Sequence, residues 1–253
     1  MEDENDNKML IIGERAPSFQ ALTTQGEISF PKDYSGKWVV LFCYRADFTA
    51  VCTTELMILA SMYSEFKSIN TELIGLSGDS IYSHIAWIRK IKELAWKDTK
   101  HVEVTFPLIS DSSLEISKKY AMPGQDIDQM QVLNSTYLID PEGKIRAAFC
   151  YPAEVGRNIP EMKRLIMALQ KVDSEGVAVP ADWLPEEDIL LLAPETSGLA
   201  TERMEQVSEN RYCIDWFLSF RQAEIADDSK EKEPEVNLYP SAYPMRRRSS
   251  NRR

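Results

Sequence analysis

The chain has 253 residues and a formal net charge of −11, with 43% hydrophobic and 27% charged residues. Its length allows one large domain or one domain with an appendage, and its apolar content can form a sizeable core. The excess of negative charge argues against a general nucleic-acid binder. No run reaches the length of a membrane span, and the acidic start MEDENDNKML lacks the apolar core of a secretory signal. We therefore expect a cytoplasmic protein that does not insert into membranes.

The first half of the chain alternates between strand and helix patterns. Residues 38–43 (WVVLFC) form a continuous apolar run that is typical of a buried strand. Apolar residues at helical spacing follow over 50–68, and again after Asp79-Ser80, which can cap a helix. The predicted elements are a hairpin within 11–30, strands at 38–43, 72–76 and 105–109, and helices at 50–68, 81–91 and 111–120.

After residue 134 the helical spacing gives way to two short β-rich runs, which is typical of a hairpin. Residues 135–139 and 144–150 are β-rich and flank the turn Asp140-Pro141-Glu142-Gly143. Residues 157–172 return to helical spacing. The order β-α-β-α-β-α-β-β-α predicts an α/β fold over residues 1–172, with a mixed central sheet and helices on both faces.

Two further segments follow this domain. Residues 173–225 read as an irregular, proline-punctuated arm with a short helix at about 199–207 and an aromatic run near its end. An arm this apolar must pack on its own domain or on a partner subunit, so we expect it to serve dimerisation. Residues 226–253 end in RRRSSNRR and predict a disordered tail, which is either solvated or binds an anionic partner.

One of the four cysteines stands out by its position. None belongs to a CxxC pair, and no Cys/His cluster has zinc spacing, so we expect no metal site. Cys52 falls in the first turn of the helix after the strand at 38–43, where backbone N–H groups and the helix dipole favour a thiolate. Thr49 can turn its hydroxyl toward the same pocket, and Glu55 can orient nearby donors. Cys43 and Cys150 end strands and are expected to be ordinary core thiols.

The segment YRADFTAVCTTE around Cys52 resembles the peroxidatic motif of peroxiredoxins, whose core pattern is Pro-x-x-x-Thr-x-x-Cys. Other segments resemble the same family, and RYCIDWF resembles the C-terminal arm of its longer, one-cysteine-like subgroup. The segments are GERAPSF at 13–19, GKWVVLF at 36–42, LSGDSIYSHIAWI at 76–88, LIDPEGKIRAAFCYP at 138–152, GRNIPEMKRLIMALQ at 156–170, VPADWLP at 179–185 and RYCIDWF at 211–217.

The resemblance implies a thioredoxin-like fold and a homodimer that can assemble further, up to a decamer. It implies reduction of hydrogen peroxide or organic hydroperoxides with no metal or organic cofactor. Catalysis would pass through a Cys52 sulfenic acid, which a thiol reductant, either a thioredoxin-like protein or a small thiol, then reduces.

Several positions depart from the family pattern. The motif proline is Arg45, and the distant arginine of the family falls at Asn134. Losing one charged donor in a closed site costs roughly a hundredfold or more in rate, so peroxide activation is expected to suffer. Arg45 has two open placements: a substitute guanidinium beside the Cys52 thiolate, or a loop arginine in solvent. The histidine that precedes the motif proline in the subgroup is Tyr44 here.

Other residues in the similar segments carry weaker expectations. Cys213 lies in the arm, where some relatives hold a resolving cysteine, although the resolving position itself falls at Ser219. Cys213 is therefore either a resolving cysteine or a neighbouring cysteine of the arm without that role. His84 is expected to be structural or at an interface, and Arg157 to anchor loops or the partner's arm.

Three functions remain open at this point. The leading hypothesis is a thiol peroxidase that uses Cys52, with Thr49 positioning the peroxide. The alternative is a non-catalytic or redox-sensing scaffold that uses the dimer and the arginine-rich tail. A thiol–disulfide oxidoreductase is the least favoured, because it needs a CxxC pair.

Overall fold

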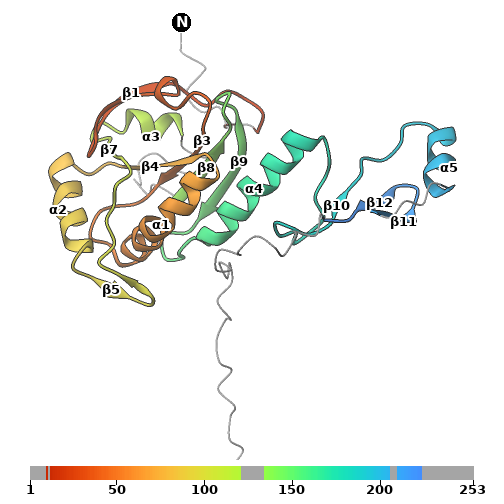
Figure 1. The fold of residues 1–253 in the computed structure, drawn as a ribbon. Helices are drawn as coiled ribbons and strands as arrows, with labels where there is room; N and C mark the ends of the chain where they lie inside the picture. The colour runs from red at the N-terminus through yellow and green to blue at the C-terminus, as the bar shows by residue number, and fades with distance from the viewer. Residues whose placement is uncertain (1–9, 11, 121–133, 206–209, 224–253) are drawn as a thin grey trace, which may run out of the picture. The chain divides into compact units, whose positions relative to one another are not determined.

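The computed structural model describes residue 10 and residues 12–120, 134–205 and 210–223. The chain divides into two compact units, Met1–Leu169 and Gln170–Arg253, and Figure 1 shows the elements of each. The tail expected at 226–253 lies outside the described residues. Within the described part, no helix is long and apolar enough to cross a bilayer.

A seven-stranded mixed sheet forms the centre of the N-terminal unit, in the order β2-β1-β7-β4-β3-β8-β9. The pairs β3–β4 and β4–β7 are parallel, and the remaining neighbours are antiparallel. The mixed sheet predicted from the sequence is confirmed. Its strands are β1 (Phe19–Thr23), β2 (Gly26–Phe30), β3 (Trp38–Cys43), β4 (Thr71–Ser77), β7 (Leu108–Ser110), β8 (Asn134–Ile139) and β9 (Ile145–Tyr151).

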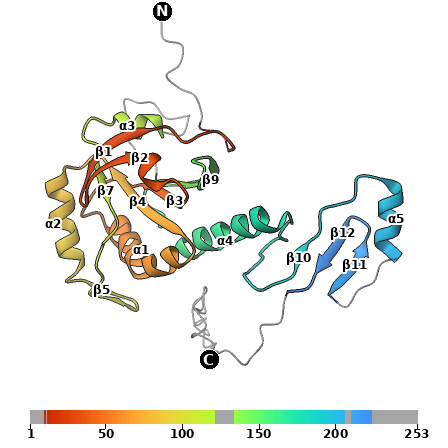
Figure 2. The same cartoon turned by 45° about the horizontal axis from the view of Figure 1, so that its top comes forward.

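Two buried clusters hold the sheet between its helices. One cluster joins alternate β3 side chains, such as Val40 and Phe42, to apolar residues of α1, α2 and α4. The other joins Val39 and Leu41 to α3 and to the β1–β2 hairpin. Figures 1 and 2 show α1 and α4 side by side on one side of the sheet. The helices are α1 (Ala50–Ser68), α2 (Ile81–Ile91), α3 (Glu115–Lys119) and α4 (Ile159–Glu175), with a 3-10 turn at Lys32–Tyr34.

The observed bounds differ from the predicted ones mainly around β7 and α3. The strand expected at 105–109 begins only at Leu108, directly after Pro107, which has no N–H to donate to a ladder. The helix expected from Asp111 begins later, because the Asp111 carboxylate accepts hydrogen bonds from the Ile116 and Ser117 N–H groups, at 3.2 and 2.6 Å. A small hairpin of β5 (Ala95–Trp96) and β6 (Thr99–Lys100) was not predicted.

The sheet is closely packed at Gly75 in β4. A Cβ atom there would lie 2.5 Å from Leu108 Cδ2 and 2.9 Å from Phe42 Cζ. These distances are far shorter than a normal carbon–carbon contact, so only glycine fits without moving the neighbours. The Phe42 ring therefore lies directly against the backbone of the neighbouring strand.

The C-terminal unit contains a sheet of its own, where an irregular arm was expected. It has three strands in the order β10-β12-β11, and all pairs are antiparallel. Figure 2 shows this sheet beside α5, and Tyr212 stacks on Phe220 with ring centroids 4.9 Å apart. Its elements are β10 (Ile189–Leu190), α5 (Ser197–Glu205), β11 (Arg211–Asp215) and β12 (Leu218–Arg221).

Candidate active site

Cys52 lies where β3 passes into α1, as the sequence predicts. β3 ends at Cys43, a loop follows over residues 44–49, and α1 begins at Ala50 with Thr49 as its N-cap. Cys52 is therefore in the first turn, where N–H groups without helical partners and the positive end of the dipole favour a thiolate. The thiol is free and only 3% exposed. A small molecule can reach a thiol this deep more easily than a large one.

Thr49 closes the turn that leads into the helix. Its hydroxyl donates a hydrogen bond to the Ala46 carbonyl at 2.8 Å. Its own carbonyl accepts from the Thr53 N–H at 2.9 Å and from the Thr53 hydroxyl at 2.7 Å. In this geometry the Thr49 hydroxyl already donates its proton to the loop. To contact a peroxide as predicted, Thr49 would accept a hydrogen bond at its hydroxyl oxygen or rotate its side chain.

A buried arginine lies beside the first turn of α1. The Arg157 side chain has no exposed surface, and its Nη2 donates to the Cys43 carbonyl. The guanidinium carbon lies 5.7 Å from the centre of the Phe42 ring. Burial lowers the pKa of Arg157, while negative charge on Glu55, Cys43 and Cys52 acts in the opposite direction. Arg157 is thus a cation within electrostatic reach of a Cys52 thiolate.

Glu55 holds this arginine in place. Glu55 Oε1 accepts a hydrogen bond from the Arg157 backbone N–H at 2.8 Å and lies 3.6 Å from Arg157 Nε. Burial raises the pKa of the Glu55 carboxyl, and Arg157 offsets part of that rise. Among the described residues, Glu55 Oε2 and Arg157 Nη1 are buried without a hydrogen-bond partner. Arg157 Nε also has no hydrogen-bond partner among these residues, so the pair keeps two donor atoms and one acceptor atom unpaired.

Of the two placements left open for Arg45, the structure shows the loop arginine in solvent, and the buried guanidinium near Cys52 is that of Arg157. Arg45 is exposed, and no hydrogen bond or ion pair joins it to another described residue. Arg157, expected to anchor loops or a partner's arm, is the buried cation of the site. A Cβ atom on its neighbour Gly156 would lie 3.8 Å from Val51 Cγ1, which places this loop against the first turn of α1. The sequence signal was an arginine in a short loop directly before an amphipathic helix.

Asn134 stands at the start of β8 where the family has its distant arginine. Its side chain is completely buried, and neither amide atom has a hydrogen-bond partner among the described residues. Thr136, two residues along the same face of β8, also has an unpartnered buried hydroxyl. The position therefore offers polar amide atoms but no charge.

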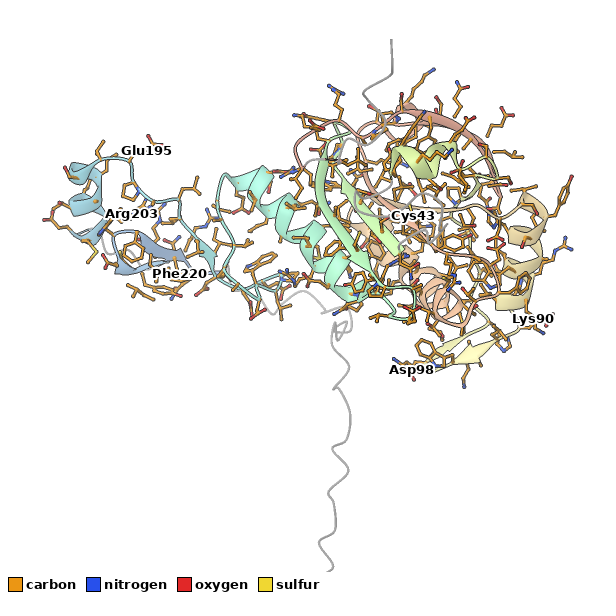
Figure 3. The ribbon with its side chains drawn as sticks, turned by 180° about the vertical axis from the view of Figure 1, so that it is seen from behind. Cys43, Lys90, Asp98, Glu195, Arg203 and Phe220 are labelled. Carbon is orange, nitrogen blue, oxygen red and sulfur yellow. The ribbon has the colours of Figure 1, made fainter. Side chains whose placement is uncertain are left out.

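The remaining cysteines occupy different environments. Burial raises the pKa of Cys43 to about 11, against the opposing effects of a Ser135 hydrogen bond and the Arg157 charge. In Figure 3 Cys43 lies among the crowded side chains of the sheet, whereas Lys90 projects from the surface. Cys150 is exposed on β9 rather than in the core as expected. Cys213 belongs to the C-terminal unit, where its thiol donates to the Asp215 carbonyl at 2.9 Å.

Comparison with known proteins agrees with this geometry. Residues 12–148 match the AhpC/TSA family, and residues 168–206 match the C-terminal domain of 1-Cys peroxiredoxin. A peroxiredoxin of Methanosarcina mazei is 49% identical over 214 residues, covering 84% of this chain and 98% of the relative. A peroxiredoxin of Aquifex aeolicus is 43% identical over 217 residues, covering 82% and 94%.

Solved structures show the same fold. A yeast mitochondrial 1-Cys peroxiredoxin, 38% identical, superposes with a TM-score of 0.71 over 85% of this chain and all of that one. A cysteine-to-serine mutant of peroxiredoxin 6 from Arenicola marina, 28% identical, gives 0.72 over 85% and 98%. With a first-turn cysteine, a buried arginine and family matches over both units, the chain belongs to the peroxiredoxin (AhpC/TSA) family of thiol peroxidases.

Proposed function

We propose that Cys52 is the nucleophile with which this peroxidase reduces hydrogen peroxide or an organic hydroperoxide. The observation that carries the proposal is the buried Arg157 guanidinium, which donates to the Cys43 carbonyl and pairs with Glu55 within electrostatic reach of a first-turn cysteine. A cation and a helix N-terminus both favour the thiolate, which is the reactive form of cysteine.

The reaction follows from this arrangement. The Cys52 thiolate attacks one peroxide oxygen, the O–O bond breaks, and the leaving oxygen takes a proton to depart as water or an alcohol. Cys52 becomes a sulfenic acid. A thiol then displaces the hydroxyl as water to form a mixed disulfide, and a second thiol releases Cys52 by exchange. Arg157 keeps a free donor, Nη1, that can stabilise negative charge on the breaking O–O bond.

The reductant is an external thiol in this proposal. The yeast relative was studied for thiol resolving via the glutathione and thioredoxin systems, so we propose a thioredoxin-like protein or a small thiol here. Cys213 remains the candidate for an internal resolving cysteine. Its half-buried thiol also lies 3.1 Å from the Ser219 hydroxyl, and Ser219 is the position where the subgroup places its resolving residue.

We further propose that the chain forms a homodimer through its C-terminal unit. Four large apolar side chains of β11 and the following turn are between 40% and 64% exposed: Tyr212, Ile214, Trp216 and Phe217. Several large apolar side chains exposed within six residues of the chain favour a contact with another protein. Light scattering coupled to size-exclusion chromatography tests the dimer and any larger ring.

The test of the peroxidase is direct trapping of the sulfenic acid. One equivalent of hydrogen peroxide is added to the reduced protein, dimedone is added at intervals, and tryptic peptides are weighed. We expect the adduct on Cys52 within seconds and its absence in Cys52→Ser, while Cys213→Ser, the matched control, still forms it. A Cys52 thiol that stays free for minutes would exclude the proposed function and favour the non-catalytic scaffold.

A further inference from the structure

A second buried polar network lies behind the loop that carries Thr49. It joins Tyr44 and Asp47 of this loop to His84 of α2. His84 Nδ1 lies 2.8 Å from Asp47 Oδ2, and the Tyr44 hydroxyl donates to Asp47 Oδ1 at 3.1 Å. The His84 and Asp47 side chains are 0% and 1% exposed. Groups this deeply buried must satisfy one another, because water cannot.

The hydrogen positions in this network follow from the partners. His84 Nε2 lies 3.1 Å from the Ile109 carbonyl, which can only accept, so Nε2 carries a hydrogen. At 2.8 Å a proton must also lie between Nδ1 and the Asp47 carboxylate, because two lone pairs would otherwise face each other. Burial, and then the charge of Asp47, raises the pKa of Tyr44, so its hydroxyl remains a donor. Every acceptor of the cluster therefore faces a hydrogen.

Asp47 is also held from its backbone. Its N–H donates to Asp79 Oδ2 at 2.8 Å, and that carboxylate accepts from the Ser77 hydroxyl at 3.0 Å. The next residue, Phe48, has a left-handed φ of 58°. A phenylalanine is unfavourable in this conformation, and it persists only where the surroundings fix it. The hydrogen bonds of the Asp47 side chain and of its backbone N–H fix the chain directly before Phe48.

The same helix also holds the first turn that contains Cys52. Trp87, one turn after His84, donates from Nε1 to the Thr53 hydroxyl at 3.2 Å. Its ring lies 5.5 Å from that of Tyr44, centre to centre. Thus α2 contacts the loop through His84 and the start of α1 through Trp87. The position of the Cys52 thiol depends on both contacts.

We propose that His84 is a positioning residue for the Cys52 reaction: through Asp47 and Tyr44 it holds the loop at residues 44–49 closed, so that Thr49 and the first turn of α1 present Cys52 in one geometry. The proposal rests on the proposed role of Cys52. It also predicts that the loss of His84 has the opposite effect on reagents larger than a peroxide, which should then react faster with Cys52. Because Cys52 is only 3% exposed, a bulky thiol reagent must wait for this segment to open, and the His84–Asp47 pair opposes opening.

The experiment measures both rates in the same full-length variants. The peroxide rate is followed by dimedone trapping of Cys52, and access is followed by reaction of Cys52 with a bulky maleimide, both read by peptide mass spectrometry. For His84→Leu we expect the peroxide rate to fall by about ten- to a hundredfold, since small misplacements of a reacting group have effects of this size. We expect the maleimide rate to rise by about tenfold as the segment opens more often.

Two further variants keep the test independent of folding. Tyr44→Phe removes only one hydroxyl and should change both rates in the same directions by a smaller factor. His101→Gln alters the other histidine of the chain, whose Nδ1 contacts the Lys92 carbonyl at the surface, and should leave both rates unchanged. Circular dichroism confirms that each variant is folded.

The outcomes separate the two proposals. A lower peroxide rate with a higher maleimide rate supports the positioning role. Rates for His84→Leu and Tyr44→Phe that match the wild type, or that fall together, overturn it. If the wild type itself forms no sulfenic acid, the proposed peroxidase fails, and the maleimide rates still decide whether His84 holds the loop closed.

Discussion

The aromatic side chains near Cys52 and those of the proposed dimer contact differ in how deeply they are buried. In the N-terminal unit Tyr44 and Trp87 are at most 2% exposed, and they belong to the same buried cluster as Cys52. In the C-terminal unit Trp216 and Phe217 are 43% and 53% exposed. The rings near Cys52 are covered within their own unit, whereas exposed apolar side chains like those of the C-terminal unit usually mark a contact with another protein. We therefore propose that the N-terminal unit carries the chemistry and the C-terminal unit the dimer contact.

The largest effect should separate two buried thiols within the N-terminal unit. Burial raises the pKa of Cys43 to about 11, so at pH 8 only about one molecule in a thousand carries its thiolate. We expect iodoacetamide to modify Cys52 at neutral pH, and Cys43 only as the pH approaches 11. Differential isotope labelling measures both sites, with circular dichroism at each pH. Because the two thiols are equally buried, equal rates at pH 8 would contradict an activation of Cys52 by the helix N-terminus and Arg157.

The next largest effect concerns the buried cation. Replacing Arg157 alone would leave Glu55 charged and unpaired, so the variant Arg157→Met/Glu55→Gln is compared with Glu55→Gln. We expect the peroxide rate to fall by about a hundredfold, the size of one charged donor in a closed site. Arg45→Ala is the matched control and should stay within about threefold, because an exposed charge is screened. A larger loss in Arg45→Ala would return the role to Arg45.

A smaller effect tests the exposed surface of the C-terminal unit. Phe217→Ser removes a large apolar group from the proposed dimer contact and should weaken the dimer by about tenfold or more. Tyr82→Ser is the control, because Tyr82 is 81% exposed in the N-terminal unit. Sedimentation velocity over a concentration series measures both. Equal dissociation constants for the two variants would place the dimer contact elsewhere.

The smallest effect is a pH dependence of stability at Glu55. Burial raises the pKa of this carboxyl in the folded state. A raised folded pKa stabilises the fold below the unfolded pKa, and this contribution is lost as the pH rises through the folded value. The wild type should therefore lose stability relative to Glu55→Gln between about pH 4 and pH 7. Urea denaturation at both pH values measures the difference, and an opposite trend would mean that Arg157 dominates.

Local patterns predicted the elements around Cys52 well. The apolar run WVVLFC became β3 with the predicted bounds, and the helical spacing over 50–68 became α1 with the same first and last residues. The bounds of both elements are set mainly by residues that are close together in the sequence. The cysteine's place in the first turn follows directly from these two patterns.

Features that depend on distant contacts could not be predicted in the same way. The sheet of the C-terminal unit pairs Ile189 with Arg221, and strands this short have no recognisable period. The role of Arg157 depends on its burial against Cys43 and Glu55, and a sequence shows its charge but not its burial. The family resemblance draws attention to Asn134, but its complete burial, with no hydrogen-bond partner among the described residues, depends on the fold.

The close contact at Gly75 has a consequence for how this family member can change. The Phe42 ring lies against Gly75, and its centre lies 5.7 Å from the Arg157 guanidinium carbon. A methyl group at position 75 would displace the Phe42 ring or the Leu108 side chain, or require a smaller residue at 42 or 108. In evolutionary terms, positions 42, 75 and 108 should vary together or not at all. Gly75, which does not contact the peroxide, would then limit which sequences can keep Arg157 in place.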